Sequence, residues 1–354
     1  MKKIISIINI QNRNIVIYLL SDLASKALPF LFIPLLTKYL TPEQYGNISL
    51  FNIWVEISVI IIIMGGNSYY KIEYLNFEDP IAELYNVIFN VTLCFLIVLL
   101  FSIFFCFYFP SIYLFRIMPV IILCAFLQSL LYLYVSYYQC NERALVVGGV
   151  NLLCSLFNSL LMILLLSVVG LKESSRYWSF TISLLLSVLF VAFSISFKNK
   201  TKLKLNINLP LLRFGLGIFP HAISWWARSG VERLLISWYL SVSLLGIYSL
   251  AMQITSLMPL FCNAINQALI PKIIRSLNEE NIRGTKRILF GAALAVISVC
   301  VISSIFMPVL LRMFINYRYL DALNYLPYMI LVFSFQSIIV FYSNVLYFYK
   351  KVKY

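Results

Sequence analysis

The sequence predicts an all-α protein, a polytopic bundle of membrane-spanning helices, and two observations carry this prediction. First, the 354 residues are 62% hydrophobic and only 11% charged, with a mean hydropathy of +0.92. Soluble domains carry about 25% charged residues, so a chain this poor in charge cannot cover a water-facing surface. Second, apolar runs of the length needed to cross a hydrocarbon core recur along the whole chain, which leaves no room for a large soluble domain.

Ten apolar runs are long enough to span a bilayer as helices. Lipid offers no partners to backbone amides and carbonyls, so a spanning segment must satisfy them internally, which these long runs do as helices. One of the ten, 211–238, contains several polar residues, so a continuous and a broken helix are both open for this run. The runs are 14–36, 47–66, 84–109, 117–138, 144–169, 177–197, 211–238, 246–269, 288–311 and 322–348.

The positive charge of the chain lies mostly between these runs. With the N-terminus inside, the inner connections hold three times as many Lys and Arg residues as the outer ones. The positive-inside rule therefore predicts a multi-pass protein with both termini in the cytoplasm. The same rule accounts for the formal net charge of +14, so we expect no nucleic-acid partner. No signal-peptidase site follows Lys2 and Lys3, so the first run should remain in the mature protein.

Residues for metal binding or catalysis are scarce. The seven cysteines include no C-x-x-C pair, and His221 is the only histidine. This composition predicts no metal site and no cofactor, with the cysteines acting as small apolar packing residues. The outer connections contain no Ser/His/Asp or paired-carboxylate arrangement. We therefore expect no catalytic residues and no enzyme, although a membrane-bound polysaccharide polymerase or acyltransferase remains an alternative.

An internal repeat is visible at an offset of 200 residues. The segment 39–50 (YLTPEQYGNISL) aligns with 239–250 (YLSVSLLGIYSL) with five identities, and the same offset places the first four runs over the last four. Such a parallel repeat predicts two pseudo-repeated six-helix lobes. The predicted domains are an N-terminal lobe at 1–197, a basic cytoplasmic linker at 198–210 and a C-terminal lobe at 211–354. The second lobe has only four runs, so by the repeat a complete chain should reach about 400 residues.

Ionisable residues inside the predicted spans are candidate functional residues, because a charge at bilayer depth costs several kcal/mol. The cations suit an anionic substrate, since an arginine guanidinium binds phosphate oxygens through two parallel hydrogen bonds. The remaining ionisable residues are candidates for ion coupling. The substrate-binding candidates in a central cavity are Lys26, Arg228 and Arg233. The ion-coupling candidates are Asp22, Glu56, His221 and Glu232.

A purely structural interpretation of these charges also stands. Asp22 and Lys26 lie four residues apart, as do Arg228 and Glu232, so each pair shares a helix face. Neutralised pairs of this kind would hold helices together without contacting any substrate.

Three segments resemble a known family. They are Asn14–Tyr18 with Ala27–Gly46, then Val231–Ile236, and Leu245–Ser249. They are similar to bacterial polysaccharide-biosynthesis membrane proteins. These include the O-antigen and capsule repeat-unit flippases of the multidrug/oligosaccharidyl-lipid/polysaccharide exporter superfamily. An Asp commonly occupies the position of Glu232 in that family. This chain departs from the family pattern in having ten predicted spans instead of twelve or more.

The resemblance implies two lobes around a central cavity and transport by alternating access. The implied substrate is an undecaprenyl-pyrophosphate-linked oligosaccharide, moved from the cytoplasmic to the periplasmic leaflet of the bacterial inner membrane for O-antigen (lipopolysaccharide) or capsule assembly. Lys26, Arg228 and Arg233 match positions where such proteins place cavity charges. The implied partners are membrane lipids, the polysaccharide polymerase and the chain-length machinery.

Two further alternatives remain open at this point. One is a cation-coupled multidrug exporter of the same superfamily, with Asp22 as a proton or sodium site. The other is a non-transporting scaffold.

Overall fold

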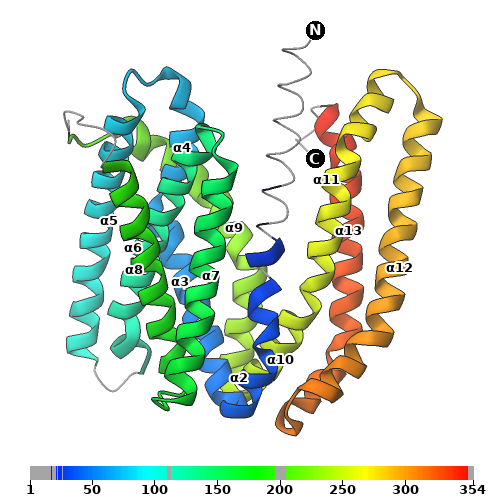
Figure 1. Cartoon of the computed structure of the whole chain (residues 1–354), viewed down its shortest axis with the longest axis horizontal. Coiled ribbons are helices and arrows are strands. Elements are labelled where there is room, and N and C mark those ends of the chain that lie inside the picture. The colour runs from blue at the N-terminus through cyan, green and yellow to red at the C-terminus, as the bar shows by residue number, and fades with distance from the viewer. Residues whose placement is uncertain are drawn as a thin grey trace. The chain divides into compact units, whose positions relative to one another are not determined.

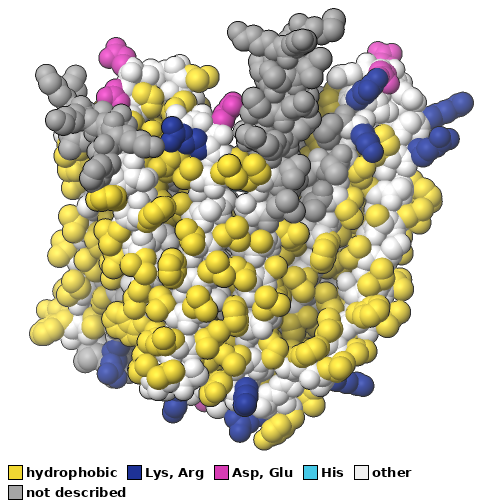
Figure 2. All heavy atoms as spheres, in the orientation of Figure 1, with side chains coloured by type: hydrophobic (Ala, Val, Ile, Leu, Met, Phe, Trp, Pro, Cys, Tyr) yellow, Lys and Arg dark blue, Asp and Glu magenta, His cyan; other side chains and the backbone are white. Residues whose placement is uncertain are grey.

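The computed structural model describes residues 17, 21, 23–25, 27–109, 113–196 and 205–349. The described residues are helical almost throughout and contain no strand (Figure 1). Eight of the helical stretches are long and apolar enough to cross a membrane. Hydrophobic side chains cover the flanks of the helices in Figure 2, whereas charged side chains gather at the helix ends. The prediction of an all-α, polytopic membrane bundle is therefore confirmed.

The eight spans coincide with eight of the ten predicted runs. The run 246–269 is divided, because α10 ends at Thr255 and α11 begins at Leu257. The helices that form the spans are α3 (Pro42–Ile63), α5 (Pro80–Tyr108), α6 (Tyr113–Cys140), α7 (Ala144–Ser167), α8 (Ser174–Ser196), α10 (Val242–Thr255) with α11 (Leu257–Asn278), α12 (Ile282–Phe314) and α13 (Leu326–Phe348).

The other two predicted runs differ from these eight. About a third of 14–36 lies outside the described residues, and nearly all of the rest is helical; the short helix α2 (Ile33–Tyr39) begins within the run and extends past its end. The run 211–238 forms α9 (Leu209–Tyr239), a single helix that continues through Pro220, so the break that its polar residues left open does not occur. Its polar residues keep α9 out of the set of eight apolar spans.

Two compact units emerge from the packing of the chain, and we describe each by itself. Unit 1 comprises Met1–Pro29 and Gly46–Val242, and unit 2 comprises Phe30–Tyr45 and Ser243–Tyr354. Unit 1 thus contains α9, the first helix of the predicted C-terminal lobe. The units are groups defined by packing, so they do not test the division at 198–210, which rests on the repeat and stays a prediction.

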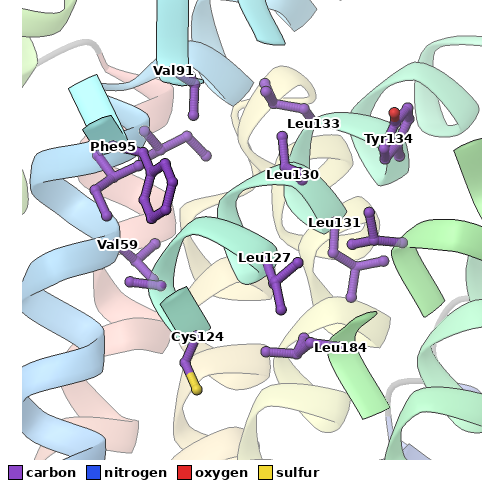
Figure 3. Close-up of a cluster of buried hydrophobic side chains, with 14 of the residues drawn as sticks. Val59, Val91, Phe95, Cys124, Leu127, Leu130, Leu131, Leu133, Tyr134 and Leu184 are labelled. Carbon is purple, nitrogen blue, oxygen red and sulfur yellow. The ribbon is translucent and has the colours of Figure 1, made fainter. Parts of the chain in front are cut away.

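The core of unit 1 lies among α3, α5, α6 and α8. Figure 3 shows Val59, Phe95, Cys124 and Leu184 pointing into this core from the four helices. The rings of Phe95 and Phe126 stack at 4.1 Å between α5 and α6. Close packing of this kind is what associates helices in lipid, where water supplies no hydrophobic driving force.

A break after α3 sets the direction of the next segment in unit 1. Met64 and Gly65 both adopt positive φ values, 42° and 68°, in the left-handed region that glycine tolerates best. The chain then forms α4 (Gly66–Glu73) and a short 3₁₀ turn, η1 (Tyr74–Asn76), before α5. The predicted span 47–66 therefore ends at Ile63, and α4 is a separate element.

Unit 2 contains α11, α12 and α13, which pack against one another. A 3₁₀ helix, η2 (Tyr317–Asn324), connects α12 to α13 and holds the segment that follows α2. The fully buried Tyr319 donates a 3.1 Å hydrogen bond to the carbonyl of Leu40, and its ring meets Tyr45 edge-on. Burial raises the pKa of the Tyr319 hydroxyl well above its usual value, which keeps it protonated as a donor.

The helix boundaries follow the 200-residue offset closely. Helices α2 and α9 end at Tyr39 and Tyr239, and α3 and α10 begin at Pro42 and Val242. The repeated segment is therefore a repeated helix–turn–helix junction as well as a sequence match.

Candidate functional site

Helix α9 carries four of the seven predicted site residues. A group of four asparagines and one glutamate fixes where this helix begins. We call Glu83, Asn86 and Asn90 on α5, with Asn206 and Asn208 before α9, the asparagine clamp. The three α5 residues follow an i, i+3, i+7 spacing, which places them on one helix face. Asn86 and Asn90 are both buried.

The asparagine clamp pairs the backbone of the segment before α9 with side chains of α5. Asn206 N–H donates to Asn86 Oδ1 at 3.1 Å, and Asn208 N–H donates to Asn90 Oδ1 at 3.0 Å. Asn90 Nδ2 donates to the Asn206 carbonyl, and Asn208 Nδ2 donates to Glu83 Oε1. Asn208 Oδ1 also caps α9 by accepting from the N–H of Leu211. The start of α9 is therefore tied to α5.

One face of α9 packs into unit 1. Gly215 is buried, and a Cβ there would lie 2.3 Å from the carbonyl oxygen of Met64, so only glycine permits this approach. Further along, the indole N–H of Trp226 donates to the carbonyl of Ile53 at 3.3 Å. These contacts hold α9 against α3.

Arg233 lies on the packed side of α9 and faces Glu56 of α3. Its Nη2 is 3.8 Å from Glu56 Oε2, and its Nε donates to the Ser229 carbonyl at 2.7 Å. The Arg233 side chain is 16% exposed, and that of Glu56 is 51% exposed. The cation is therefore neutralised and held in place, whereas the carboxylate remains accessible.

The opposite face of α9 is exposed and polar. His221, Ser224, Trp225 and Arg228 are all exposed and lie at i, i+3, i+4 and i+7, so they share one side of the helix. We call these four residues the exposed face of α9. The Arg228 guanidinium lies 4.2 Å from the centroid of the Trp225 ring, which is a cation–π contact.

Neither of the two predicted charge pairs is seen among the described residues. Arg228 makes no ion pair with Glu232 there and is stacked on Trp225 instead. Glu232 is partly buried and has no hydrogen bond or ion pair with the described part of the chain. Asp22 and Lys26 lie outside the described residues, so their pairing and their roles stay predictions.

His221 also lines a small cavity within unit 1. The cavity has a volume of about 240 Å³ and lies among α3, α4, α6 and α9. Its polar lining comes from Asn67, Ser68, Tyr132 and His221, and the rest is apolar. The Tyr132 hydroxyl accepts a 2.8 Å hydrogen bond from Gln128 Nε2. A cavity of this size accommodates a small group rather than an oligosaccharide.

Two features of this region are absent from the sequence-based predictions. The asparagine clamp was not predicted, because its asparagine amides carry no charge, although Asn86 and Asn90 stand out as amides in an apolar run. The Glu56–Arg233 pair joins residues far apart in the chain, and the i+4 rule cannot find such a partner.

Comparison with known proteins finds a family and several relatives. The sequence model of a family described as "Polysaccharide biosynthesis protein" matches residues 12–277. An "Uncharacterized membrane protein" of Haemophilus influenzae is 24% identical over 283 residues, covering 75% of this chain and 66% of the relative. The "Lsg locus putative protein 1" of the same organism is also 24% identical, with 67% of its length covered. The matched region therefore spans about two thirds of these relatives.

Solved structures of transporters share the fold. A multidrug resistance MATE family transporter of the MOP superfamily in an inward-facing conformation has a TM-score of 0.66 at 15% identity, covering 92% of this chain and 84% of the other. A mutant of a Vibrio cholerae MATE transporter has a TM-score of 0.55 at 15% identity, with 100% and 89% covered. A MOP superfamily transporter from Pyrococcus furiosus has a TM-score of 0.52 at 14% identity, with 95% and 84% covered. At these identities the likeness shows the fold alone.

Proposed function

Because this chain belongs to the family of polysaccharide biosynthesis proteins, we propose that it is a flippase for a lipid-linked oligosaccharide. In this proposal it moves an undecaprenyl-pyrophosphate-linked repeat unit from the cytoplasmic to the periplasmic leaflet of a bacterial inner membrane. The product serves surface polysaccharide assembly, as O-antigen or capsule. The fold shared with membrane transporters supports a transport role.

The exposed face of α9 is the observation that supports this substrate class most directly. Arg228 offers a planar set of donors that suits a pyrophosphate, and no described acid neutralises it. Trp225 is 62% exposed and presents a flat apolar ring against which a sugar could stack. His221 and Ser224 add hydrogen-bonding groups on the same side. One helix face thus combines groups for the anionic and the sugar parts of such a substrate.

The Glu56–Arg233 pair supplies a route to ion coupling in this proposal. When Glu56 takes up a proton, its carboxylate loses its charge and no longer attracts Arg233. The guanidinium on the packed side of α9 is then released from this acid and becomes available to an anionic group of the substrate. The exposure of Glu56 gives a proton access to this carboxylate.

A cation-coupled multidrug exporter is the alternative, since multidrug transporters have the same fold. The sign of the charge on α9 argues against it. The exposed face of α9 carries the cation Arg228 and no acidic side chain, and this cation would repel a cationic drug.

The test uses the native bacterium with the gene deleted and the full chain returned on a plasmid. We expect deletion to abolish surface polysaccharide and to leave the lipid-linked oligosaccharide inaccessible from outside in spheroplasts. The wild-type chain should restore both, Arg228→Gln should restore neither at equal expression, and Arg228→Lys should restore part. Arg283→Gln, which removes an exposed cation from α12, is the matched control. Normal display after gene deletion, or a change only in drug resistance, would reject the flippase proposal, whereas normal display with Arg228→Gln would reject the role of Arg228.

A further inference from the structure

A second site lies at the start of α9, away from its exposed face. There, α4 and the first turns of α9 enclose a pocket with a volume of about 460 Å³, which we call the interfacial pocket. This volume falls within the roughly 300–1,000 Å³ typical of small-molecule sites. The residues that line it are Tyr69, Ile72, Glu73, Leu209, Pro210, Arg213 and Phe214.

The walls of the interfacial pocket are held in place from both sides. The asparagine clamp ties the chain to α5 immediately before Leu209. The rings of Tyr69 and Phe214 contact each other across α4 and α9, with centroids 5.8 Å apart. A Cβ on Gly65 would lie 2.8 Å from a methyl of Ile218, so the two elements also approach closely where α4 begins.

The interfacial pocket carries one charge of each sign, and the two are not paired with each other. Arg213 forms no hydrogen bond or ion pair with any described residue. Glu73 accepts a 2.7 Å hydrogen bond from Asn76, which orients the carboxylate without neutralising it. A ligand that carries both a cation and an anion would satisfy both groups at once.

The rim of the interfacial pocket is apolar and exposed. Ile72 and Leu209 are 63% and 69% exposed. Ile72 lies near the end of α4, the short helix that follows the apolar span α3, and Leu209 lies at the start of α9. Because α4 comes directly after a span, we infer that the rim lies near the polar headgroups. Apolar side chains beside opposite charges at this level match an amphipathic ligand.

We propose that the interfacial pocket binds a phospholipid whose zwitterionic headgroup bears a primary ammonium, namely phosphatidylethanolamine. Its phosphate binds Arg213, its ammonium donates to Glu73, and its acyl chains lie over Ile72 and Leu209. The choline headgroup has no N–H to donate, and Glu73 repels a purely anionic headgroup or a lipid pyrophosphate. Arg213 and Arg228 are fifteen residues apart on α9, about 22 Å along a helix, so this site is separate from the exposed face.

The experiment is native mass spectrometry of the delipidated full chain in detergent, titrated with lipids of identical acyl chains. The headgroups are phosphatidylethanolamine, its mono- and dimethyl derivatives, phosphatidylcholine and phosphatidylglycerol. We expect phosphatidylethanolamine to bind at least fivefold more tightly than phosphatidylcholine and phosphatidylglycerol. Affinity should fall with each methyl group added, because each removes an N–H donor. This series needs no substitution, so it stands even if a variant fails to fold.

Two variants assign the contacts. Glu73→Gln should abolish the preference for phosphatidylethanolamine over phosphatidylcholine. Arg213→Gln should lower the affinity for every phospholipid at least fivefold. Glu78→Gln and Arg143→Gln, which alter exposed charges outside the pocket, should leave both properties unchanged. Equal binding of all headgroups, tighter binding of phosphatidylglycerol, or a preference that survives Glu73→Gln would overturn the proposal. None of these outcomes depends on the transported substrate, so the flippase proposal can fail or hold separately.

Discussion

Trp225 and Arg228 form an exposed cation–π contact on α9, and their stacking has a measurable consequence. We predict that Trp225→Ala slows translocation of the lipid-linked oligosaccharide several-fold in proteoliposomes, because it removes both the ring and its hold on Arg228. A cation–π contact contributes about 0.5–2 kcal/mol, which sets the scale of the loss. Trp225→Phe should retain most of the rate. Trp238→Ala is the control, since Trp238 is equally exposed on α9 and has no described arginine over it. Equal effects of the two alanine variants would contradict the assignment.

The Glu56–Arg233 pair gives a second prediction for single residues. We expect Glu56→Gln and Arg233→Gln each to lower the midpoint of thermal unfolding in detergent, because each leaves the other charge without its partner. In the double variant, the midpoint of thermal unfolding should fall by less than the sum of the two single decreases. The coupling should be about 1 kcal/mol or below, because Glu56 is half-exposed and solvent screens the pair. Strictly additive effects would show that the two groups do not interact in solution.

Single residues also show what sequence reasoning reaches and what it misses. The intramembrane charges of α9 and α3 were recognisable because ionised side chains are rare in apolar runs. Their partners were not, because the i+4 rule proposed Glu232 for Arg228, and the structure places Trp225 under that cation. An arginine in a span can pair with an aromatic ring on its own helix or with an acid on another helix, and the tertiary structure determines which contact forms.

At the scale of elements, the asparagine clamp determines where α9 starts. We predict that Asn90→Ala lowers the midpoint of thermal unfolding and speeds proteolysis at 205–208. The substitution leaves the Asn208 N–H and the Asn206 carbonyl without these partners. A buried polar group without a hydrogen bond costs about 1–3 kcal/mol. Asn263→Ala is the matched control, because Asn263 is exposed and forms none of the described hydrogen bonds. Unchanged stability of Asn90→Ala would mean that the clamp does not hold the segment.

The start of α3 tests the packing of another element. A Cβ on Gly46 would lie 2.0 Å from the carbonyl oxygen of Val242, which is backbone and cannot move aside cheaply. We therefore predict that Gly46→Ala destabilises the protein by about 1–3 kcal/mol, the usual effect of overpacking. Gly149→Ala should be close to neutral, because no atom lies within 4 Å of its added Cβ. Comparable losses in the two variants would assign the effect to helix flexibility rather than to the contact.

The elements were predicted best where lipid imposes a simple rule. Apolar runs of sufficient length must be helices in a bilayer, and eight of the ten runs appear as such spans. The division of 246–269 at Ser256 and the separate helix α4 were not predicted, because backbone breaks leave little trace in hydropathy. The continuity of α9 stayed open in the sequence for a related reason. Its polar residues suggested a break, whereas in the folded chain Arg233 donates a hydrogen bond to the Ser229 carbonyl and His221 lines a cavity.

For the whole molecule, the sidedness of the loops follows from charge and remains to be measured. We predict that a cysteine replacing Lys172, after α7, reacts with a membrane-impermeant maleimide in intact spheroplasts. A cysteine replacing Arg283, at the start of α12, should react only after the membrane is permeabilised, because the cation-rich connections face the cytoplasm. The unsubstituted chain reports any labelling of the native cysteines. The reverse pattern would invert the predicted orientation.

The repeat anticipated the helix–turn–helix junctions at both positions, because a copied segment in a similar setting folds alike. It did not anticipate that α9 groups with unit 1 and that Phe30–Tyr45 groups with unit 2. Such grouping depends on long-range contacts, of which the Tyr319–Leu40 hydrogen bond and the asparagine clamp are examples. A repeat in the sequence reports ancestry and orientation, not the neighbours that each helix acquires.

The polar character of α9 bears on how the chain is made. A helix with this many charges partitions poorly into lipid on its own as it leaves the ribosome and the translocon. Its partners on α3 and α5 are synthesised earlier, so the side chains that pair with α9 are already in the membrane when α9 emerges. Biogenesis of the later helices would then depend on that capture, and variants of the asparagine clamp would appear first as misinserted, rapidly degraded chains.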